Sequence, residues 1–198
     1  MSLKLEAPRP TLSAMPVSAH DVAAILRARQ PGMPVKKLHK LLYYCQGHHL
    51  AAFDEPLFTE TISAYDRGPV VGTLWHQEKY GQDRPAPTEL DESQLNTIGY
   101  VLSRYGALSG TDLEHLTHGE LPWQLANANR VPGGRARIDR DWMRDYFRGD
   151  GAAGDDLDDP GPLDSESVAV LLAGAEARRG GPVEPDTWAG IQRLIDGG

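Results

Sequence analysis

The sequence predicts a mainly α-helical domain of the α+β class, with a small β element and an acidic C-terminal extension. Apolar residues recur at three- and four-residue spacing in several segments, and the stretch that reads as extended is short. No internal repeat or heptad array is present. With 198 residues, 40% of them apolar, the chain can bury one core with extensions.

Composition divides the chain into three parts. Residues 1–16 contain three prolines and no apolar periodicity, which predicts a mobile N-terminal arm. Residues 17–148 hold the periodic segments and are predicted to form the domain. Residues 149–198 begin with a linker rich in Gly, Ala, Asp and Pro, and two short helices are expected at 165–179 and 186–195.

Charge is distributed unevenly. Residues 149–198 hold 11 acidic and 3 basic residues, which equals the net charge of −8 of the whole chain, whereas residues 1–148 are neutral. A neutral domain without a basic stripe argues against a nucleic-acid partner and a transcriptional regulator. No apolar run is long enough for a membrane span and no secretion signal is evident, so a cytoplasmic location without a membrane partner is expected.

Two helices are expected first. Ser18 and Asp21 form a capping-box pattern, and the helix that they open is expected to stop at Pro31. The next helix should run from near Pro34 to Asp54. Its apolar spacing predicts a single buried face, formed by Leu38, Leu41, Leu42, Cys45, His49 and Ala52.

The middle of the chain predicts the β element. Residues 57–65 read as one or two short extended pieces, and residues 66–69 read as a tight turn in which Gly68 takes a conformation that other residues avoid. Pro69 suits the first position of a further helix, which Gly81 should end.

Four more elements are expected toward residue 148. One helix spans residues 95–105, with Gly106 as its left-handed C-terminal residue. Thr111 and Glu114 form a capping-box pattern for a helix ending at 118–119, and Pro122 restarts a short helix through residue 127. After a loop at 131–136, Asp139 can cap a last helix.

Several residues could carry chemistry. Cys45 and His49 stand at the spacing of a nucleophile and base, but their place on the apolar face favours core packing. His48 and His49 with His115 and His118 could bind zinc, although the known zinc spacings are absent. Tyr65 and Arg67 could form a small-anion site at the turn, and a solvated Arg67 beside a purely structural turn is the alternative. No catalytic residue, metal or cofactor is therefore predicted.

One ordered set of motifs resembles a known family. Residues 37–51 read Lys-Leu-His-Lys-Leu-Leu-Tyr-Tyr-Cys-Gln-Gly-His-His-Leu-Ala. They resemble the Lys-Leu-x-Lys-Leu-Leu-Tyr-Tyr-x-Gln-Gly-x-His-Leu-Ala segment of the Panacea domain of SocA-like antitoxins. Pro-Leu-Phe at 56–58, Ala-Tyr-Asp-Arg-Gly-Pro-Val-Val at 64–71, Leu-Thr-His at 116–118 and Pro-Trp at 122–123 follow in the family's order, so the resemblance covers about residues 17–148.

This resemblance implies a non-enzymatic antitoxin that neutralises a cognate protein toxin by direct binding, and some relatives also present the toxin to a protease. Tyr65 replaces the family's usual Trp and Arg67 replaces an aromatic residue, so the partner surface at the turn should differ. A small hydrolase or transferase that uses Cys45 with His49, or His115 with His118, is the alternative.

The site prediction contains two sets. The residues expected to contact the partner are Tyr65, Arg67, Trp75, His118, Trp123 and Trp188. The residues expected to be structural are Ser18, Leu38, Leu41, Leu42, Cys45, His49, Gly68 and Pro69.

Overall fold

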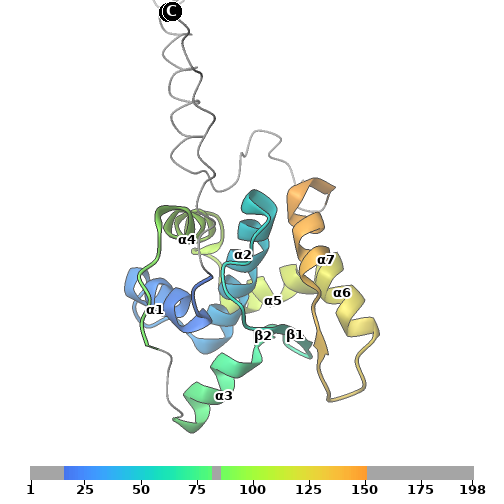
Figure 1. Ribbon diagram of the computed structural model, residues 1–198. Helices are drawn as coiled ribbons and strands as arrows, with labels where there is room; N and C mark the ends of the chain where they lie inside the picture. The colour runs from blue at the N-terminus through green and yellow to red at the C-terminus, as the bar shows by residue number, and fades with distance from the viewer. Residues whose placement is uncertain (1–15, 82–85, 151–198) are drawn as a thin grey trace, which may run out of the picture. The chain divides into compact units, whose positions relative to one another are not determined.

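A computed structural model describes residues 16–81 and 86–150 of the chain. It confirms the predicted fold class: helices predominate, and one three-stranded antiparallel sheet is present (Figure 1). In chain order the elements are α1 (Ala19–Arg29), α2 (Val35–Phe53), β1 (Ile62–Tyr65), β2 (Gly68–Val71), α3 (Gly72–Tyr80), α4 (Glu92–Tyr105), α5 (Gly110–Gly119), α6 (Leu121–Ala128), β3 (Ala136–Arg137), α7 (Arg140–Asp145) and a π-helical turn, η1 (Tyr146–Asp150). The helices expected at 165–179 and 186–195 lie outside the described residues.

Helix α2 is the central element. Every residue from Leu38 to Leu50 is buried, and α1, α4, α5, α7 and β2 all contact this helix (Figure 1). The prediction of a single buried face was therefore too narrow, and it was wrong for Ala52, which is exposed. Periodicity could not show this, because polar residues of α2 are buried as deeply as its leucines.

Two of these buried polar residues hold strand β2. The ring nitrogen Nδ1 of His39 accepts a hydrogen bond from the backbone N–H of Val71 at 3.3 Å. The ammonium of Lys40 donates to the carbonyl oxygen of Pro69 at 3.2 Å. Burial lowers the pKa of His39 to about 4 and that of Lys40 to about 8, because a charged form is poorly solvated there.

Two other buried polar residues of α2, Gln46 and His49, hold two further segments against this helix. The amide of Gln46 bonds both backbone groups of Phe58, accepting from its N–H at 3.1 Å and donating to its carbonyl at 3.2 Å. Nδ1 of His49 lies 2.8 Å from Oγ1 of Thr97 in α4. Each of these four side chains thus bonds a particular neighbouring segment, which fixes how these segments pack around α2.

The helix ends agree with the predicted signals in most cases. Ser18 and Asp21 form the expected capping box at α1, and Asp139 caps α7. At α5, however, the box consists of Ser109 and Asp112 rather than Thr111 and Glu114. The helix begins two residues earlier than the predicted motif allows, and Glu114 instead forms an ion pair with Lys36.

Of two glycines predicted to end helices in the left-handed region, one does so. Gly81 has φ 63°, as expected for a left-handed C-terminal residue. Gly106 was predicted wrongly, because its φ of −65° is right-handed. Its carbonyl accepts from Lys37 Nζ at 2.6 Å and Gln30 Nε2 at 3.0 Å, so side chains from the first two helices complete this helix end.

The sheet has the order β2-β1-β3. Strand β1 pairs antiparallel with β2 through Ala64 opposite Pro69, and with β3 through Ser63 opposite Arg137. Pro69 therefore lies in a strand, and the prediction that it starts a helix was wrong, since α3 begins at Gly72. An edge strand tolerates the missing N–H of proline as well as a helix start does.

Within the described ranges, no helix has both the length and the apolar character that a membrane span requires.

Candidate partner-binding site

The two faces of the sheet differ in chemistry. In β1, Ile62 and Ala64 are buried and belong to the hydrophobic core. Thr61, Ser63 and Tyr65, which alternate with them, line a groove on the opposite face. Alternation follows from the two-residue period of a strand, so one short segment supplies both a core contact and a polar surface.

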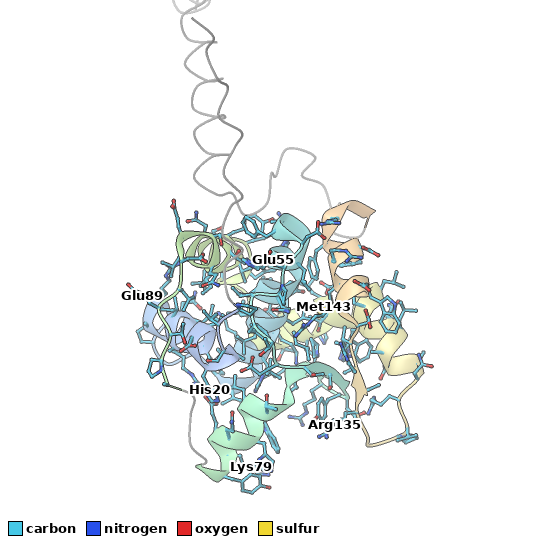
Figure 2. All side chains as sticks on the ribbon, viewed as in Figure 1. His20, Glu55, Lys79, Glu89, Arg135 and Met143 are labelled. Atoms are coloured by element: carbon cyan, nitrogen blue, oxygen red, sulfur yellow. The ribbon has the colours of Figure 1, made fainter. Side chains whose placement is uncertain are left out.

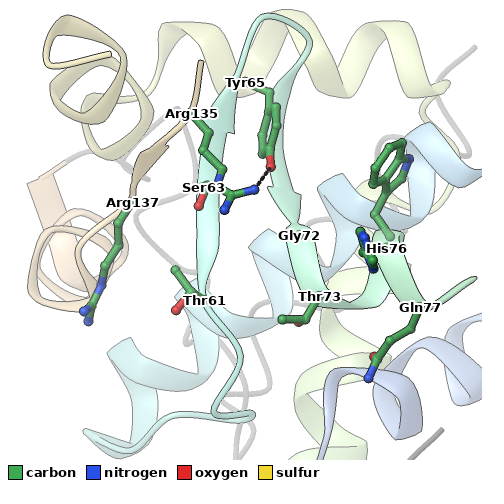
Figure 3. Close-up of a pocket in the computed structure, with 10 residues that line it drawn as sticks. Thr61, Ser63, Tyr65, Gly72, Thr73, His76, Gln77, Arg135 and Arg137 are labelled. Atoms are coloured by element: carbon green, nitrogen blue, oxygen red, sulfur yellow. Dashed lines mark hydrogen bonds between the residues drawn. The ribbon is translucent and has the colours of Figure 1, made fainter. Parts of the chain in front are cut away.

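Strand β3 and helix α3 complete the groove, which has a volume of about 610 Å³ (Figure 3). Arg137 lies beside Ser63 in the sheet register, and Arg135 precedes it by two residues. The opposite wall is α3, from which Thr73 and His76 face the groove (Figure 3). Gln77 lies at its end, where Oε1 is 2.6 Å from Nε2 of His20 in α1. The groove therefore brings together residues more than 60 positions apart.

The groove has a basic and aromatic character. None of its described lining residues is Asp or Glu, whereas Arg135 and Arg137 are both exposed there. Nη1 of Arg135 donates to the hydroxyl of Tyr65 at 3.4 Å, as the dashed line in Figure 3 marks. Guanidinium groups in a lining without carboxylates favour a ligand that carries negative charge.

Trp75 forms an aromatic edge of the groove. Its exposed fraction is 41%, and the ammonium of Lys79 lies 4.6 Å from the centre of its ring. In Figure 2, Lys79 and Arg135 both project on the lower side of the view. A large aromatic side chain that is half in solvent beside cationic groups is typical of a protein contact surface.

The predicted contact residues fall in different places. Tyr65 and Trp75 both line the groove. Arg67 is exposed in the turn between β1 and β2 but does not line the groove, and its neighbour Asp66 pairs with Arg130 at 2.5 Å. Trp188 lies outside the described residues. The structure thus brings together two of these four residues.

The other two predicted contact residues form a separate pair at the α5–α6 junction. The rings of His118 and Trp123 stack with centroids 4.0 Å apart. Trp123 is 8% exposed, so its ring is largely part of the core. This pair does not line the groove, and its tight packing gives it a structural contribution whatever else it contacts.

Sequence reasoning missed most of the groove. Thr61, Ser63, Thr73, Arg135 and Arg137 were not predicted as site residues. The alternation of polar and apolar residues from Thr61 to Tyr65 could have indicated one exposed strand face. No local signal could place the two arginines, because the pairing of residue 137 with residue 63 is a tertiary contact.

The first pair of the hydrolase alternative, Cys45 with His49, is inaccessible. Cys45 is fully buried, and burial raises the pKa of its thiol, so the neutral thiol predominates. His49 is also buried, and burial lowers its pKa to about 4. A buried neutral thiol is a poor nucleophile and no substrate can reach it.

The remaining predicted structural residues are placed as follows. Leu38, Leu41 and Leu42 are fully buried in α2. Ser18 is the capping residue of α1, and Gly68 has φ 90°. Each of these side chains or backbone positions serves packing or local geometry.

The histidines considered for zinc do not form a metal site. His118 stacks on Trp123, and His115 is exposed. In the part of the chain that the structure describes, no three His, Cys, Asp or Glu side chains are grouped as metal ligands.

A buried acid lies where α5 meets α6. The hydroxyl of Tyr44 donates to Oε1 of Glu120 at 2.8 Å, and Oε2 of Glu120 has no partner among the described residues. Burial raises the pKa of Glu120 to about 7, although the hydroxyl groups of Tyr43 and Tyr44 act in the opposite direction. Glu120 thus links α2 to α6 and titrates near neutral pH.

The fold and the groove define a helical domain with a buried central helix and an exposed groove lined by arginine and aromatic side chains. Residues 38–124 match the family model described as "Antitoxin SocA-like, Panacea domain". The resemblance to the Panacea family is thereby confirmed over these residues, which extend from α2 into α6. No curated protein and no solved structure matches the chain.

The match supports a toxin–antitoxin role in general and suggests that this role is not enzymatic. The β1 and α3 sides of the groove lie within the matched residues. Arg135 and Arg137 lie beyond them.

Proposed function

We propose that this protein is an antitoxin that neutralises a cognate protein toxin by direct binding, and that the groove forms part of the contact surface. The family match supports the general role. The proposed binding domain spans residues 17–148 and acts in the cytoplasm.

The observation that carries the proposal is the exposed Trp75 beside a groove with two arginines. Tryptophan, tyrosine and arginine contribute most of the binding energy in many protein interfaces, because their large surfaces lose water on contact. Leaving 41% of a tryptophan in solvent exposes apolar surface that a partner can cover.

The enzyme alternative lacks a comparable observation. Its first pair, Cys45 and His49, is buried in α2, and the ring of His118 from its second pair is stacked on Trp123. Neither pair lines the groove.

Co-expression with the product of the adjacent gene tests the proposal. The wild-type chain should restore growth, whereas Trp75→Ala should weaken toxin binding by roughly 30-fold, the loss expected for a central interface residue. Trp142→Ala is the matched control, because Trp142 is 37% exposed on α7 and does not line the groove. Failure of the wild type to bind or neutralise the neighbouring product would contradict the proposed function.

Presentation of the toxin to a protease is the second part of the proposal, and the resemblance to protease-assisted relatives supports it. The half-life of the toxin in cells should then be shorter when the antitoxin is present. An equal or longer half-life would leave direct binding as the whole mechanism.

A further inference from the structure

We propose that the groove between the sheet and α3 takes an acidic, extended segment of the partner protein, in which carboxylates alternate with neutral or apolar residues. This inference rests on the proposed function only in naming the partner as the toxin. The recognition chemistry is a property of the groove itself.

The charges around the groove are uncompensated. Arg135 and Arg137 are exposed, and no ion pair within the described ranges involves either guanidinium. With no Asp or Glu in the described lining, the site lacks the carboxylates that would neutralise them. A partner that brings carboxylates therefore forms charge-assisted hydrogen bonds without displacing an internal ion pair.

The spacing of the two arginines suits an extended chain. Arg137 ends β3 and Arg135 lies one residue before the strand begins. Residues two apart on an extended chain project to the same face, with their Cα atoms about 6.6–6.8 Å apart. Carboxylates two residues apart on an extended segment have the same separation. In Figure 3 the guanidinium of Arg135 turns toward Tyr65 and that of Arg137 points away from it, so each arginine can meet a separate carboxylate of an alternating acidic segment, and a single compact anion would reach only one of them.

A row of neutral hydroxyl groups lies beside the two arginines, on β1 and the residue that precedes it. Thr61, Ser63 and Tyr65 occupy every second position of this stretch and face the groove (Figure 3). Arg135 is held toward this row by its hydrogen bond to Tyr65. Hydroxyl groups can both donate and accept, so they can bond the backbone or carboxylates of a segment laid along the strands.

The opposite wall favours a chain segment over an enclosed small ligand. Thr73, Trp75 and His76 of α3 are all exposed, so the groove is open along this side. Sites for small molecules usually bury 70–90% or more of the ligand. An open groove with one aromatic edge instead suits a segment that passes through it and places a neutral side chain on Trp75.

Synthetic peptides test this chemistry directly on the full chain. Fluorescently labelled acetyl-(Glu-Val)₃-amide should bind, and its affinity should fall as salt rises, because exposed charges are screened. Acetyl-Glu₃-Val₃-amide has the same composition without the alternation and should bind roughly tenfold more weakly. Fluorescence anisotropy at low and high salt measures both affinities.

Charge reversal supplies the matched variants. Arg135→Glu with Arg137→Glu should weaken binding of the alternating acidic peptide at least tenfold and should create binding of acetyl-(Lys-Val)₃-amide. An unchanged circular dichroism spectrum and urea midpoint would show that the variant is folded. Arg29→Glu, an exposed arginine at the end of α1, should bind like the wild type.

The inference would be overturned if the wild type showed no salt-dependent binding, if the two acidic peptides bound equally, or if binding survived both charge reversals. If the wild type formed a dimer and the double variant Arg135→Glu/Arg137→Glu were a monomer, the occupant of the groove would be a second copy of this chain. That result would also overturn the inference. Peptide binding that appears only when Asp155, Asp156, Asp158 and Asp159 are changed to Asn would assign the groove to the chain's own acidic segment. Growth rescue by the wild type is scored separately, so failure of the antitoxin function and failure of the peptide site are distinguishable.

Discussion

Gly68 lies against the side chain of Lys40, so that a β carbon at position 68 would be 2.7 Å from Cε and 3.0 Å from Nζ of this lysine. The same β carbon would be 3.0 Å from Oγ1 of Thr117. Lys40 is 1% exposed and its ammonium donates to the carbonyl of Pro69. The turn between β1 and β2 therefore closes directly over a buried lysine, and only a glycine leaves room for it.

Gly68→Ala should consequently destabilise the fold by about 2–4 kcal/mol, because it combines a left-handed φ of 90° with steric overlap against buried groups. Gly32→Ala is the matched control: its φ is 76°, but a β carbon there would meet nothing within 4 Å. The control should lose only about 1 kcal/mol. Urea unfolding of both variants measures the difference, and equal losses would show that the Lys40 contact is not the constraint.

Gly47 and Phe147 define a second close approach. A β carbon on Gly47 would lie 2.2 Å from Cε2 of Phe147, so Gly47→Ala should displace the η1 turn from α2 and cost roughly 2–3 kcal/mol. Phe147→Ala should also destabilise by opening a cavity, but the double variant should be more stable than the sum of the two losses predicts. Strictly additive losses in a denaturant titration would contradict a direct contact between these residues.

The buried Glu120 predicts a pH dependence of stability. Its pKa in the folded state is raised from 4.5 to about 7, so the folded state binds the proton more strongly than the unfolded state does. The stability that this group supplies is complete below pH 4.5 and is lost as the pH rises through about 7. Glu120→Gln keeps the acceptor for Tyr44 without the charge, so at pH 8 it should be more stable than wild type by up to about 3 kcal/mol.

At pH 5 the stability difference between Glu120→Gln and wild type should be much smaller. The buried histidines His39 and His49, with pKa values lowered to about 4, destabilise both proteins as the pH falls below 6.5, and their effect cancels in the comparison. Glu92→Gln, at an exposed position in the first turn of α4, controls for the loss of one surface charge. A difference that does not change between pH 5 and pH 8 would mean that Glu120 is not titrating in this range.

Cys45 should be needed for packing and not for activity. Cys45→Ser places a hydroxyl among leucines and should cost about 1–3 kcal/mol of stability while leaving toxin neutralisation intact at permissive temperature. The native thiol should also resist alkylation until the chain unfolds, because it is buried and protonated. Rapid alkylation under native conditions, or loss of function in a folded Cys45→Ser variant, would contradict this assignment.

The acidic C-terminal segment predicts an effect on association rate. If the 11 acidic residues of 149–198 attract a basic region of the toxin, changing Asp155, Asp156, Asp158 and Asp159 to Asn should slow association severalfold at low salt and have little effect at high salt. Stopped-flow mixing with the toxin measures the rates. Equal rates and equal salt dependence would assign the segment no part in binding.

Local sequence signals were sufficient for the helices and for some of their ends. The Ser18–Asp21 capping box, the left-handed Gly81 and the apolar spacing of α2 and α4 are interactions between residues within a few positions of one another. Short-range hydrogen bonds and helical periodicity depend on residues only a few positions apart in the sequence, so the fold class could be predicted from them.

The placement of polar groups inside the protein and at the groove was decided only by the tertiary structure. Nothing near Lys40 in the sequence indicates that the carbonyl of Pro69 will accept its hydrogen bond, and nothing near Arg137 indicates that it will lie beside Ser63. Pro69 was expected to start a helix because local sterics permit that as readily as an edge strand, and pairing with Ala64 decided between them. These contacts depend on which segments pack together in space, so local spacing alone cannot specify the groove.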